Sequence, residues 1–372
     1  MISCLQFDKY VVRFRCGNVR YILLLHGLIF LFLEEDVKHF INTILIVVLL
    51  TVAGIVFIDP TDLLPPLASA QGVTIDWLFG IHLKIIAFLF SLVVVFMLYS
   101  VVVFRNKSGD LGDGKYIHGN TKLEIAWTVV PIIMVVVMGY IGVITLRDVT
   151  ASDPDEMVVE VVSSQWAWRF DYPDHGLSST ELILPVDQPV RFEITSMDVI
   201  HDFWVPEFRV KQDAVPGAVN LLRITPTVIG EYKVRCAELC GVRHSQMLAD
   251  VSVLDREDFD DWVVSEVARI ASLDTPEARG EQLYQNQGCI GCHSLDGTIV
   301  VGPTWLNLYG RNEELDDGTI VIADEDYLRN SILYPGDQIV SGYQNLMPAN
   351  YAEILSADDI TDLIAYIKTI RE

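Results

Sequence analysis

The sequence predicts a membrane protein of several domains, with apolar helices first, a β-barrel next and a small all-α domain at the end. Three observations predict this order. Long apolar runs are confined to the residues before 147, and short alternating runs rich in Val, Ile and Thr follow Thr150. A cysteine pair followed by histidine then precedes helical sequence near the C-terminus. A chain of 372 residues has room for two or three domains.

The composition supports the division into a membrane half and a soluble half. Hydrophobic residues make up 51% of the chain, which is too much for an ordinary soluble enzyme. The net charge of -24 is carried mainly by the residues after Thr150, so nucleic acid is excluded as a partner. An acidic exterior suits a basic soluble partner through electrostatic steering, although a merely solvated acidic face explains it equally well.

Three apolar runs are long enough, or nearly so, to cross roughly 30 Å of hydrocarbon. They cover residues 41–58, 77–104 and 125–146, whereas a fourth run at 21–33 is too short and contains His26. The loop 105–124 holds four basic residues, and the segment 59–76 holds three Asp and no Lys or Arg. The first loop is therefore predicted to be cytoplasmic, and everything after Leu146 extracytoplasmic.

The N-terminal part allows two interpretations. Ala68-Ser69-Ala70 is typical of a signal-peptidase site, so residues 41–70 are either a retained helix or a signal, which leaves two or three spans. Retention is favoured because the gap between the apolar run and Ala70 is long for a signal. Residues 1–40 are an N-terminal extension without an assigned role, and residues 77–147 form a transmembrane helical hairpin.

Thr121 and Glu124 form a capping box at the start of the last apolar helix. Capping is a sufficient structural reason for both residues. In the same helix, Trp127 is expected to be an interfacial anchor and Pro131 to produce a kink.

Residues 150–255 show the pattern of an antiparallel β-sandwich or barrel. Near its end, one loop carries two cysteines, a histidine and a methionine: Cys236, Cys240, His244 and Met247. Soft sulfur ligands with imidazole and a weak Met are the set that copper electron-transfer sites use. A second histidine is expected from another strand, and His201 is the best candidate. A zinc loop or a disulfide is the alternative, although zinc more commonly uses C-x2-C without Met.

Three segments, 198–206, 211–217 and 236–247, together resemble subunit II of cytochrome c oxidase. The resemblance runs from about Trp77 to Val253 and implies a cupredoxin-like β-barrel that holds the dinuclear copper A centre. It implies that the two cysteines bridge the coppers and that the two histidines cap them. Met247 and the main-chain carbonyl of Glu238 would complete the coordination, and the Glu238 carboxylate resembles the family's magnesium ligand. The copper set is then His201, Cys236, Glu238, Cys240, His244 and Met247.

Two further residues gain a role from this resemblance. Trp166 begins a row of four aromatics at period two, which alone predicts a buried strand face. It also matches the family's tryptophan through which electrons reach copper. Glu124 matches the family's carboxylate at the cytoplasmic mouth of a proton-uptake path.

The C-terminal part begins with a closing helix and linker at 256–274, in which Trp262, Val263, Val267 and Ile270 are available for one helical face. Residues 275–372 then contain Cys289-Ile-Gly-Cys292-His293, the attachment signature of c-type heme. In this motif the two thiols form thioethers and the histidine binds iron. Because the motifs consume both late cysteine pairs, we predict no structural disulfide.

Three features strengthen the heme assignment. Met347 lies in a later loop and can bind iron from the opposite face. The segment 302–311 resembles the part of small cytochromes c that packs on the histidine side. Ser356 and Asp359 cap a helix with an apolar face, as in their C-terminal helix. Residues 275–372 therefore resemble a class I cytochrome c domain.

Together the resemblances imply the subunit through which electrons enter a heme-copper oxidase of the caa type. Electrons would pass from the fused heme c to copper A and on to the catalytic subunit, which reduces dioxygen to water and pumps protons, so this chain is not catalytic alone. Only eight histidines are present, too few for a dioxygen-reducing centre as well. The implied partners are oxidase subunit I and other oxidase subunits, membrane lipid, and an external cytochrome c or similar donor. The implied location is the bacterial plasma membrane, with both redox domains outside. The small subunit of a copper-A nitric oxide reductase and a stand-alone tethered carrier remain as alternatives.

Overall fold

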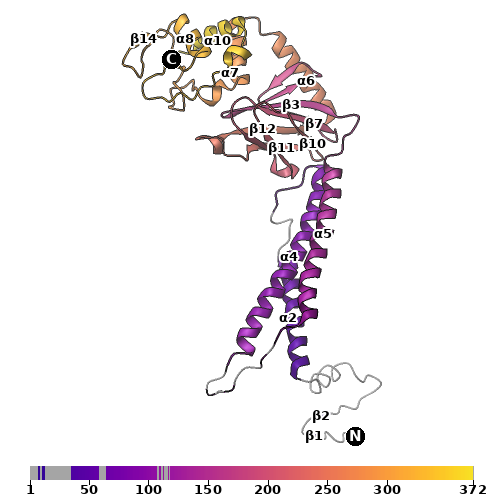
Figure 1. Cartoon of the computed structure of the whole chain (residues 1–372). Helices are drawn as coiled ribbons and strands as arrows, with labels where there is room; N and C mark the ends of the chain where they lie inside the picture. Colours follow the sequence, from indigo (N-terminus) through magenta and orange to yellow (C-terminus); the bar gives the residue numbers. More distant parts are fainter. Residues whose placement is uncertain are drawn as a thin grey trace. The chain divides into compact units, whose positions relative to one another are not determined.

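The computed structural model describes residues 7–8, 11–12, 35–57, 64–106, 109, 112, 116 and 118–371. Cys4, Cys16, the short apolar run at 21–33 and most of the predicted extension 1–40 lie outside the described residues. Two compact units make up the chain, Met1–Asp59 with Gly80–His118, and Pro60–Phe79 with Gly119–Glu372. Figure 1 shows the elements in chain order.

Three long helices confirm the three predicted apolar runs. They are α2 (Glu35–Phe57), α4 (Ala70–Val103) and α5 (Thr121–Val149), and each is long and apolar enough to cross a membrane. In the first unit, His39 Nδ1 lies 2.8 Å from the hydroxyl of Tyr99, which joins α2 to α4. Two short strands, β1 (Phe7–Asp8) and β2 (Val11–Val12), precede them.

The predicted capping box of α5 is wrong by one residue. Asn120 is the N-cap, and its side chain accepts a hydrogen bond from the backbone N–H of Leu123, while Thr121 is already helical. Glu124 Oε1 accepts from the N–H of Asn120 at 3.3 Å. Asn and Thr are both good caps, so the sequence motif alone could not choose between neighbours.

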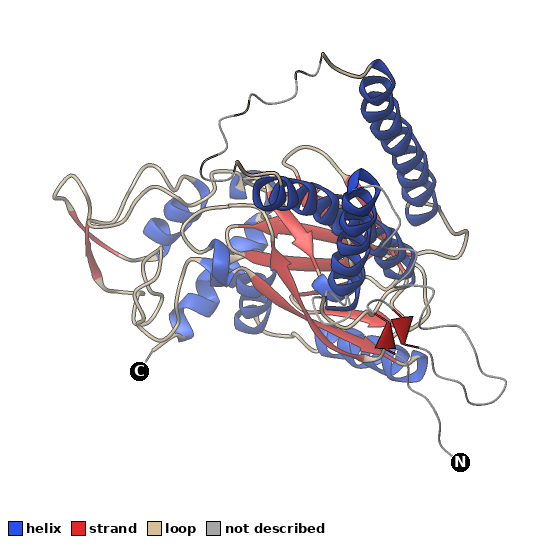
Figure 2. Cartoon of the chain, turned by 90° about the horizontal axis from the view of Figure 1, so that it is seen from below, coloured by secondary structure: helices blue, strands red, loops and turns tan. Residues whose placement is uncertain are grey.

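The second unit contains a β-domain (residues 157–254) built from two five-stranded sheets (Figure 2). The first sheet has the order β10-β7-β3-β4-β5 and the second β6-β12-β11-β8-β9. The strands are β3 (Met157–Ser164), β4 (Ala167–Tyr172), β5 (Leu177–Ser179), β6 (Leu182–Pro185), β7 (Val190–Ser196), β8 (His201–Trp204), β9 (Lys211–Ala214), β10 (Asn220–Ile224), β11 (Gly230–Cys236) and β12 (Leu248–Leu254). Two 3-10 turns, η1 (Pro206–Phe208) and η2 (His244–Gln246), interrupt them.

The expectation of purely antiparallel sheets is wrong in two places. β3 pairs with β7 in parallel, and β12 pairs with β6 in parallel. Alternation along a strand reports which face is buried and says nothing of the direction of its neighbour. The predicted two-layer β architecture with a buried core between the sheets is confirmed, and Trp168, Phe170 and Tyr172 are each at most 2% exposed.

The segment that resembles a signal-peptidase site is part of this folded domain. Ala68 is 1% exposed; its N–H donates to the carbonyl of Glu207, and its carbonyl accepts from the N–H of Thr227. The Ser69 hydroxyl donates to the carbonyl of Phe208 at 2.8 Å. Loss of these residues would remove a buried side chain and several hydrogen bonds from the domain.

Helix α6 (Arg256–Ala271) closes the β-domain as predicted. Trp262, Val263 and Ile270 pack against the β-core. Val267 was expected on the same face, and this is wrong, because its side chain is 44% exposed. It lies at the edge of the apolar stripe, where helical periodicity separates buried from exposed positions poorly.

The C-terminal domain (residues 275–371) is mainly helical. Its elements are α7 (Pro276–Asn286), η3 (Cys289–Gly291), β13 (Asn312–Glu314), β14 (Ile320–Ile322), α8 (Glu325–Leu333), α9 (Tyr351–Ile354) and α10 (Ala357–Thr369). The predicted Ser356–Asp359 capping box is present at the start of α10. Buried Tyr284, Trp305 and Leu363 belong to its core.

Helices α7 and α10 approach each other closely at Gly280. A Cβ on Gly280 would lie 2.0 Å from the backbone oxygen of Asp362, so only glycine fits. Beside it, Arg279 makes a bidentate ion pair with the Asp362 carboxylate at 2.7 and 3.0 Å. This crossing joins the two ends of the domain.

We therefore predict that Gly280→Val destabilises the C-terminal domain by at least about 2 kcal/mol, because its side chain would separate the two helices. The free energy of unfolding can be measured by denaturant titration of the heme absorbance. Ala357→Val, at an exposed position on α10, is the control and should cost at most about 0.7 kcal/mol. Equal stability of the two variants would contradict the close crossing.

Candidate metal and heme centres

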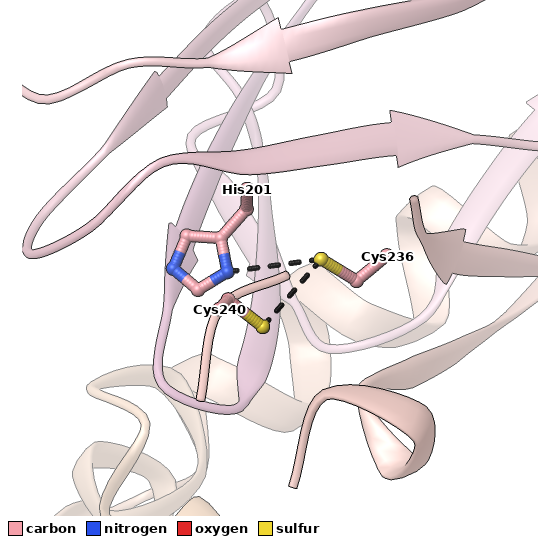
Figure 3. A group of neighbouring side chains, drawn as sticks. All are labelled: His201, Cys236 and Cys240. Atoms are coloured by element: carbon pink, nitrogen blue, oxygen red, sulfur yellow. Dashed lines mark hydrogen bonds between the residues drawn. The ribbon is translucent and has the colours of Figure 1, made fainter. Parts of the chain in front are cut away.

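The second sheet brings one sulfur-rich cluster together from separate segments. Cys236 ends β11, Cys240 lies in the following loop, and His201 begins β8, which pairs with β11. The Cys236 and Cys240 Sγ atoms are 3.6 Å apart, and His201 Nδ1 lies 3.9 Å from Cys236 Sγ (Figure 3). The ligand atoms of these three buried residues all lie within 4.8 Å of one another.

The remaining predicted ligands surround the same two sulfurs. His244 Nδ1 lies 3.5 Å from Cys240 Sγ, and Met247 Sδ lies 3.8 Å from it. The backbone carbonyl of Glu238 lies 3.2 Å from Cys236 Sγ, while the residue itself is exposed. All six predicted copper-site residues therefore lie around the two sulfurs. No sequence pattern could predict how close His201 lies to the loop that carries the cysteines.

The donor set fits copper better than the alternatives. A disulfide would need the sulfurs at about 2.05 Å, far below the observed separation, and both thiols are free. Two sulfurs, two imidazoles and a thioether match the soft ligand set of copper electron-transfer sites, whereas structural zinc rarely uses Met. The Met247 side chain is fully buried against Cys240, so it is available as a weak ligand.

The electrostatics of the cysteine pair also favour a cation. Although burial opposes ionisation, hydrogen bonds from His201 and from the backbone lower the pKa of Cys236 to about 6. Burial and the neighbouring Cys236 thiolate raise the pKa of Cys240 to about 12. The pair thus holds one negative charge readily and a second only when positive charge lies beside it.

Asp198 was part of the quoted motif but was not predicted to have a role. Its Oδ1 lies 2.9 Å from His201 Nε2, which leaves Nδ1 of the imidazole directed at Cys236. Despite its burial, hydrogen bonds from His201 and from the backbone N–H groups of Gln165 and Val199 hold the pKa of Asp198 below its usual value. An acid three residues before a ligand histidine is the sequence signal that could have indicated this orienting contact.

Trp166 lies beside the copper loop. Its indole Nε1 donates to the carbonyl of Cys240 at 3.2 Å, and the Gln165 side chain donates to the same carbonyl at 2.7 Å. Trp166 is 6% exposed. The aromatic row is therefore buried, as its period predicted, and its first member also contacts a residue of the copper site.

The heme motif lies at a cavity in the C-terminal domain. The cavity measures about 880 Å³ with the open solvent at its mouth included, and Cys292, His293 and Met347 contribute to its lining. A smaller neighbouring hollow adds Cys289. The motif histidine and the predicted distal methionine therefore border one space.

His293 is prepared to bind a metal through one nitrogen. Its Nδ1 donates to the carbonyl of Pro303 at 2.7 Å, so Nε2 keeps its lone pair. Burial lowers the pKa of His293, which keeps the ring neutral. Trp305 stacks on the ring, and a Cβ on Gly302 would lie 2.8 Å from it. This is the packing that the resemblance of segment 302–311 predicted.

Glu124, the predicted proton-uptake residue, is separate from both centres. It lies in the first turn of α5 and is exposed. The structure places no other described site residue beside it, and its carboxylate takes part in the helix cap at Asn120.

Family models match three consecutive parts of the chain. The transmembrane domain of cytochrome c oxidase subunit II matches residues 60–144, its periplasmic domain matches 177–253, and cytochrome c matches 277–371. The matched parts fall in helices α4 and α5, in the β-domain from β5 onward, and in the C-terminal domain. The protein is thus a membrane protein with extracytoplasmic domains.

Two relatives, both named cytochrome c oxidase subunit 2, match this chain over most of their own length. Cytochrome c oxidase subunit 2 of Alkalihalophilus pseudofirmus is 34% identical over 313 residues, which cover 81% of this chain and 89% of the relative. The subunit of Thermostichus vulcanus is 33% identical over 277 residues, covering 60% and 84%. The solved periplasmic domain of subunit II from Bradyrhizobium japonicum is 28% identical, covers 32% of this chain and 98% of that chain, and has a TM-score of 0.30.

The subunit II match extends through the residues that hold the sulfur-rich cluster, and the cytochrome c match extends through the heme motif and Met347. The chain therefore belongs to the cytochrome c oxidase subunit II family, and it carries a cytochrome c domain at its C-terminal end.

Proposed function

We propose that this chain is the subunit through which electrons enter a respiratory heme-copper oxidase, whose catalytic subunit reduces dioxygen to water and pumps protons. The convergence of the six copper-site residues on the Cys236–Cys240 pair carries this proposal. The relatives named cytochrome c oxidase subunit 2 support it. The attached C-terminal domain adds a second redox group in the same chain.

Each residue of the copper cluster has a defined part. Cys236 and Cys240 would hold the two copper ions together with His201 and His244, and Met247 and the Glu238 carbonyl would complete the ligand set. When bound, the copper pair supplies a one-electron redox centre. The two sheets fix the ligand-bearing segments and exclude water, so the protein has little to rearrange when the charge changes.

The C-terminal domain holds heme c. Cys289 and Cys292 would attach it covalently, His293 would bind the iron through Nε2, and Met347 would be the second iron ligand. When bound, the heme supplies a second one-electron centre whose potential the methionine raises. The His293–Pro303 hydrogen bond fixes the orientation of the imidazole.

The remaining roles concern the rest of the complex. Trp166 would be the residue through which electrons reach the copper site. Glu124 would belong to the cytoplasmic mouth of a proton-uptake path, and the exposed Glu238 carboxylate would be a ligand for magnesium shared with subunit I. The other partners are membrane lipid and an external cytochrome c or similar donor. The location is the bacterial plasma membrane, with both redox domains outside.

Purification in mild detergent tests the assembly. Copurification of heme a together with oxygen uptake is the expected result. Nitric oxide turnover would instead indicate a nitric oxide reductase, and isolation of a lone copper-heme protein would indicate a stand-alone carrier. The matches to oxidase subunit 2 do not favour these two alternatives.

Cys236→Ser is predicted to abolish the near-infrared absorption of mixed-valence copper, because a hydroxyl cannot replace the bridging thiolate. The heme c spectrum should remain. Val242→Ser, an exposed change in the same loop, is the control and should keep the band. Persistence of the band in Cys236→Ser would remove Cys236 from the ligand set.

Asp198→Asn is predicted to weaken copper binding by about 10- to 100-fold, since the uncharged amide orients His201 less well. The measurement is copper release to a chelator, followed by the near-infrared band. Asp174→Asn, at an exposed turn, serves as the control. Unchanged release from Asp198→Asn would show that the contact with His201 does not support the site.

Met347→Ala is predicted to lower the heme midpoint potential by on the order of 100 mV, part of the roughly 0.8 V range that axial ligands span. The Met-to-iron charge-transfer band should disappear. Redox titration with absorption spectroscopy measures both effects. Ile299→Ala, a strongly exposed position, should change neither. A retained band in Met347→Ala would mean that another residue binds the iron.

A further inference from the structure

Arg209 lies in the turn that joins two strands of the copper-site sheet. It follows η1 and stands between β8, which begins with His201, and β9. The two strands pair with each other, so the turn closes a hairpin whose other end carries a predicted copper ligand. The segment Pro60–Phe79, which includes the first turns of α4, belongs to the same compact unit as this hairpin.

The backbone of Arg209 is strained, and glycine would relieve the strain. Its φ of 66° lies in the left-handed region, which is unfavourable for any residue with a Cβ. A strained residue of this kind persists when something else at the position requires it. The side chain of Arg209 is therefore expected to have a role that glycine could not fill.

The Arg209 side chain donates to three separate segments. Nε donates to Asp76 Oδ1 of α4 at 2.8 Å, and the terminal nitrogens donate to the carbonyls of Pro206 at 3.0 Å and Pro65 at 2.5 Å. Only 8% of the side chain is exposed, so water competes little for these donors. The planar guanidinium suits the site because it presents several donors in fixed directions.

The stem of the same side chain packs on α4. A Cβ on Gly72 would lie 2.9 Å from Arg209 Cγ, so a larger residue at position 72 would press on the stem. Gly72 and Asp76 are four residues apart and share one face of the helix. The glycine thus leaves the space through which Arg209 extends along α4 to Asp76.

Other contacts of this turn lie nearer the start of the helix. Ala68 and Ser69 bond to the carbonyls of Glu207 and Phe208, but both residues precede α4. Asp76 is the seventh residue of α4 and lies in its second turn. The ion pair therefore extends the contact of the hairpin from the segment before the helix to the helix itself.

We propose that Arg209 is a positioning residue, which fixes the His201 hairpin to the second turn of α4. It holds the β-domain in one orientation on the start of this spanning helix, so that the copper site meets the catalytic subunit in one geometry. This inference rests on the proposed function and adds to it a residue outside the copper ligands.

Arg209→Gly tests this role directly, because it removes the side chain and relieves the left-handed backbone together. The turn should still form. Amide hydrogen–deuterium exchange of the purified oxidase should rise by about tenfold or more in residues 69–76 and 205–210. Asp187→Gly is the matched control, since Asp187 is exposed and has a φ of 58°, and it should leave exchange in these residues unchanged.

The kinetics of copper provide a readout that a merely structural role would not change. After photoreduction of heme c, the near-infrared band follows the reduction and reoxidation of copper. In Arg209→Gly the band and its reduction by heme c should match the wild type. Reoxidation by the catalytic subunit should slow by about threefold or more, since small misplacements of reacting centres lower rates steeply. Arg209→Lys, which keeps the charge, should be intermediate.

Asp76→Asn is a second variant that leaves the turn itself unchanged. It should raise exchange and slow reoxidation in the same direction as Arg209→Gly. The double variant should be no worse than Arg209→Gly alone, because both changes remove one contact. Fully additive effects would show that the two residues act separately and would overturn the proposed contact.

The outcomes separate this inference from the proposed function. Wild-type exchange in residues 69–76 of Arg209→Gly, or wild-type reoxidation of its copper, would overturn the positioning role. Absence of the near-infrared band from the wild-type complex would instead overturn the copper assignment. The exchange experiment would still test the contact in that case, because it does not depend on copper.

Discussion

Two buried cysteine sulfurs held 3.6 Å apart are the constraint around which the β-domain is organised. One thiolate forms readily there and the second does not, because the two negative charges repel in a poorly solvated place. A bound cation is needed to keep both cysteines as thiolates, and the neighbouring donor groups are placed to bind it. Pairing of β8 with β11 sets Phe203 opposite Cys236 and so brings the strand that begins with His201 beside the cysteine, and the contact of Asp198 with His201 Nε2 leaves Nδ1 directed at the sulfur.

Features that depend only on residues close together in the chain could be predicted from the sequence. The three apolar runs became α2, α4 and α5, since length and hydropathy alone decide a spanning helix. The loop from Cys236 to Met247 and the motif from Cys289 to His293 carry their ligands within a few residues, so spacing indicated the chemistry. His201 was found because a copper site of this kind needs a second imidazole.

Features that depend on distant neighbours could not be predicted in the same way. The parallel pairing of β3 with β7 depends on the path of the chain between them. Val267 lies at the edge of a helical stripe, and small rotations decide its exposure. In the sequence, Gly291 is one of the two variable positions of the heme motif. Only the folded structure shows that a side chain is excluded there, because the backbone of Trp166 lies against it. Asn120 and Thr121 differ by one position in a cap that either could form.

The origin of the ligands also bears on how the two centres are assembled. The heme cysteines and His293 lie within five consecutive residues, so the attachment motif exists in an unfolded chain. The predicted copper ligands come from β8, from the end of β11 and from the loop after it, and they meet only after both strands have paired. Copper must therefore load onto a folded domain, whereas heme can be attached before the C-terminal domain closes. A side-chain N–H of Arg243 donates to the carbonyl of Gly291, and Cys292 Sγ lies 3.6 Å from the carbonyl of Gln165. Docking of the motif against Gln165 and Arg243 would hinder later access to Cys292, which places heme attachment before docking in the order of maturation.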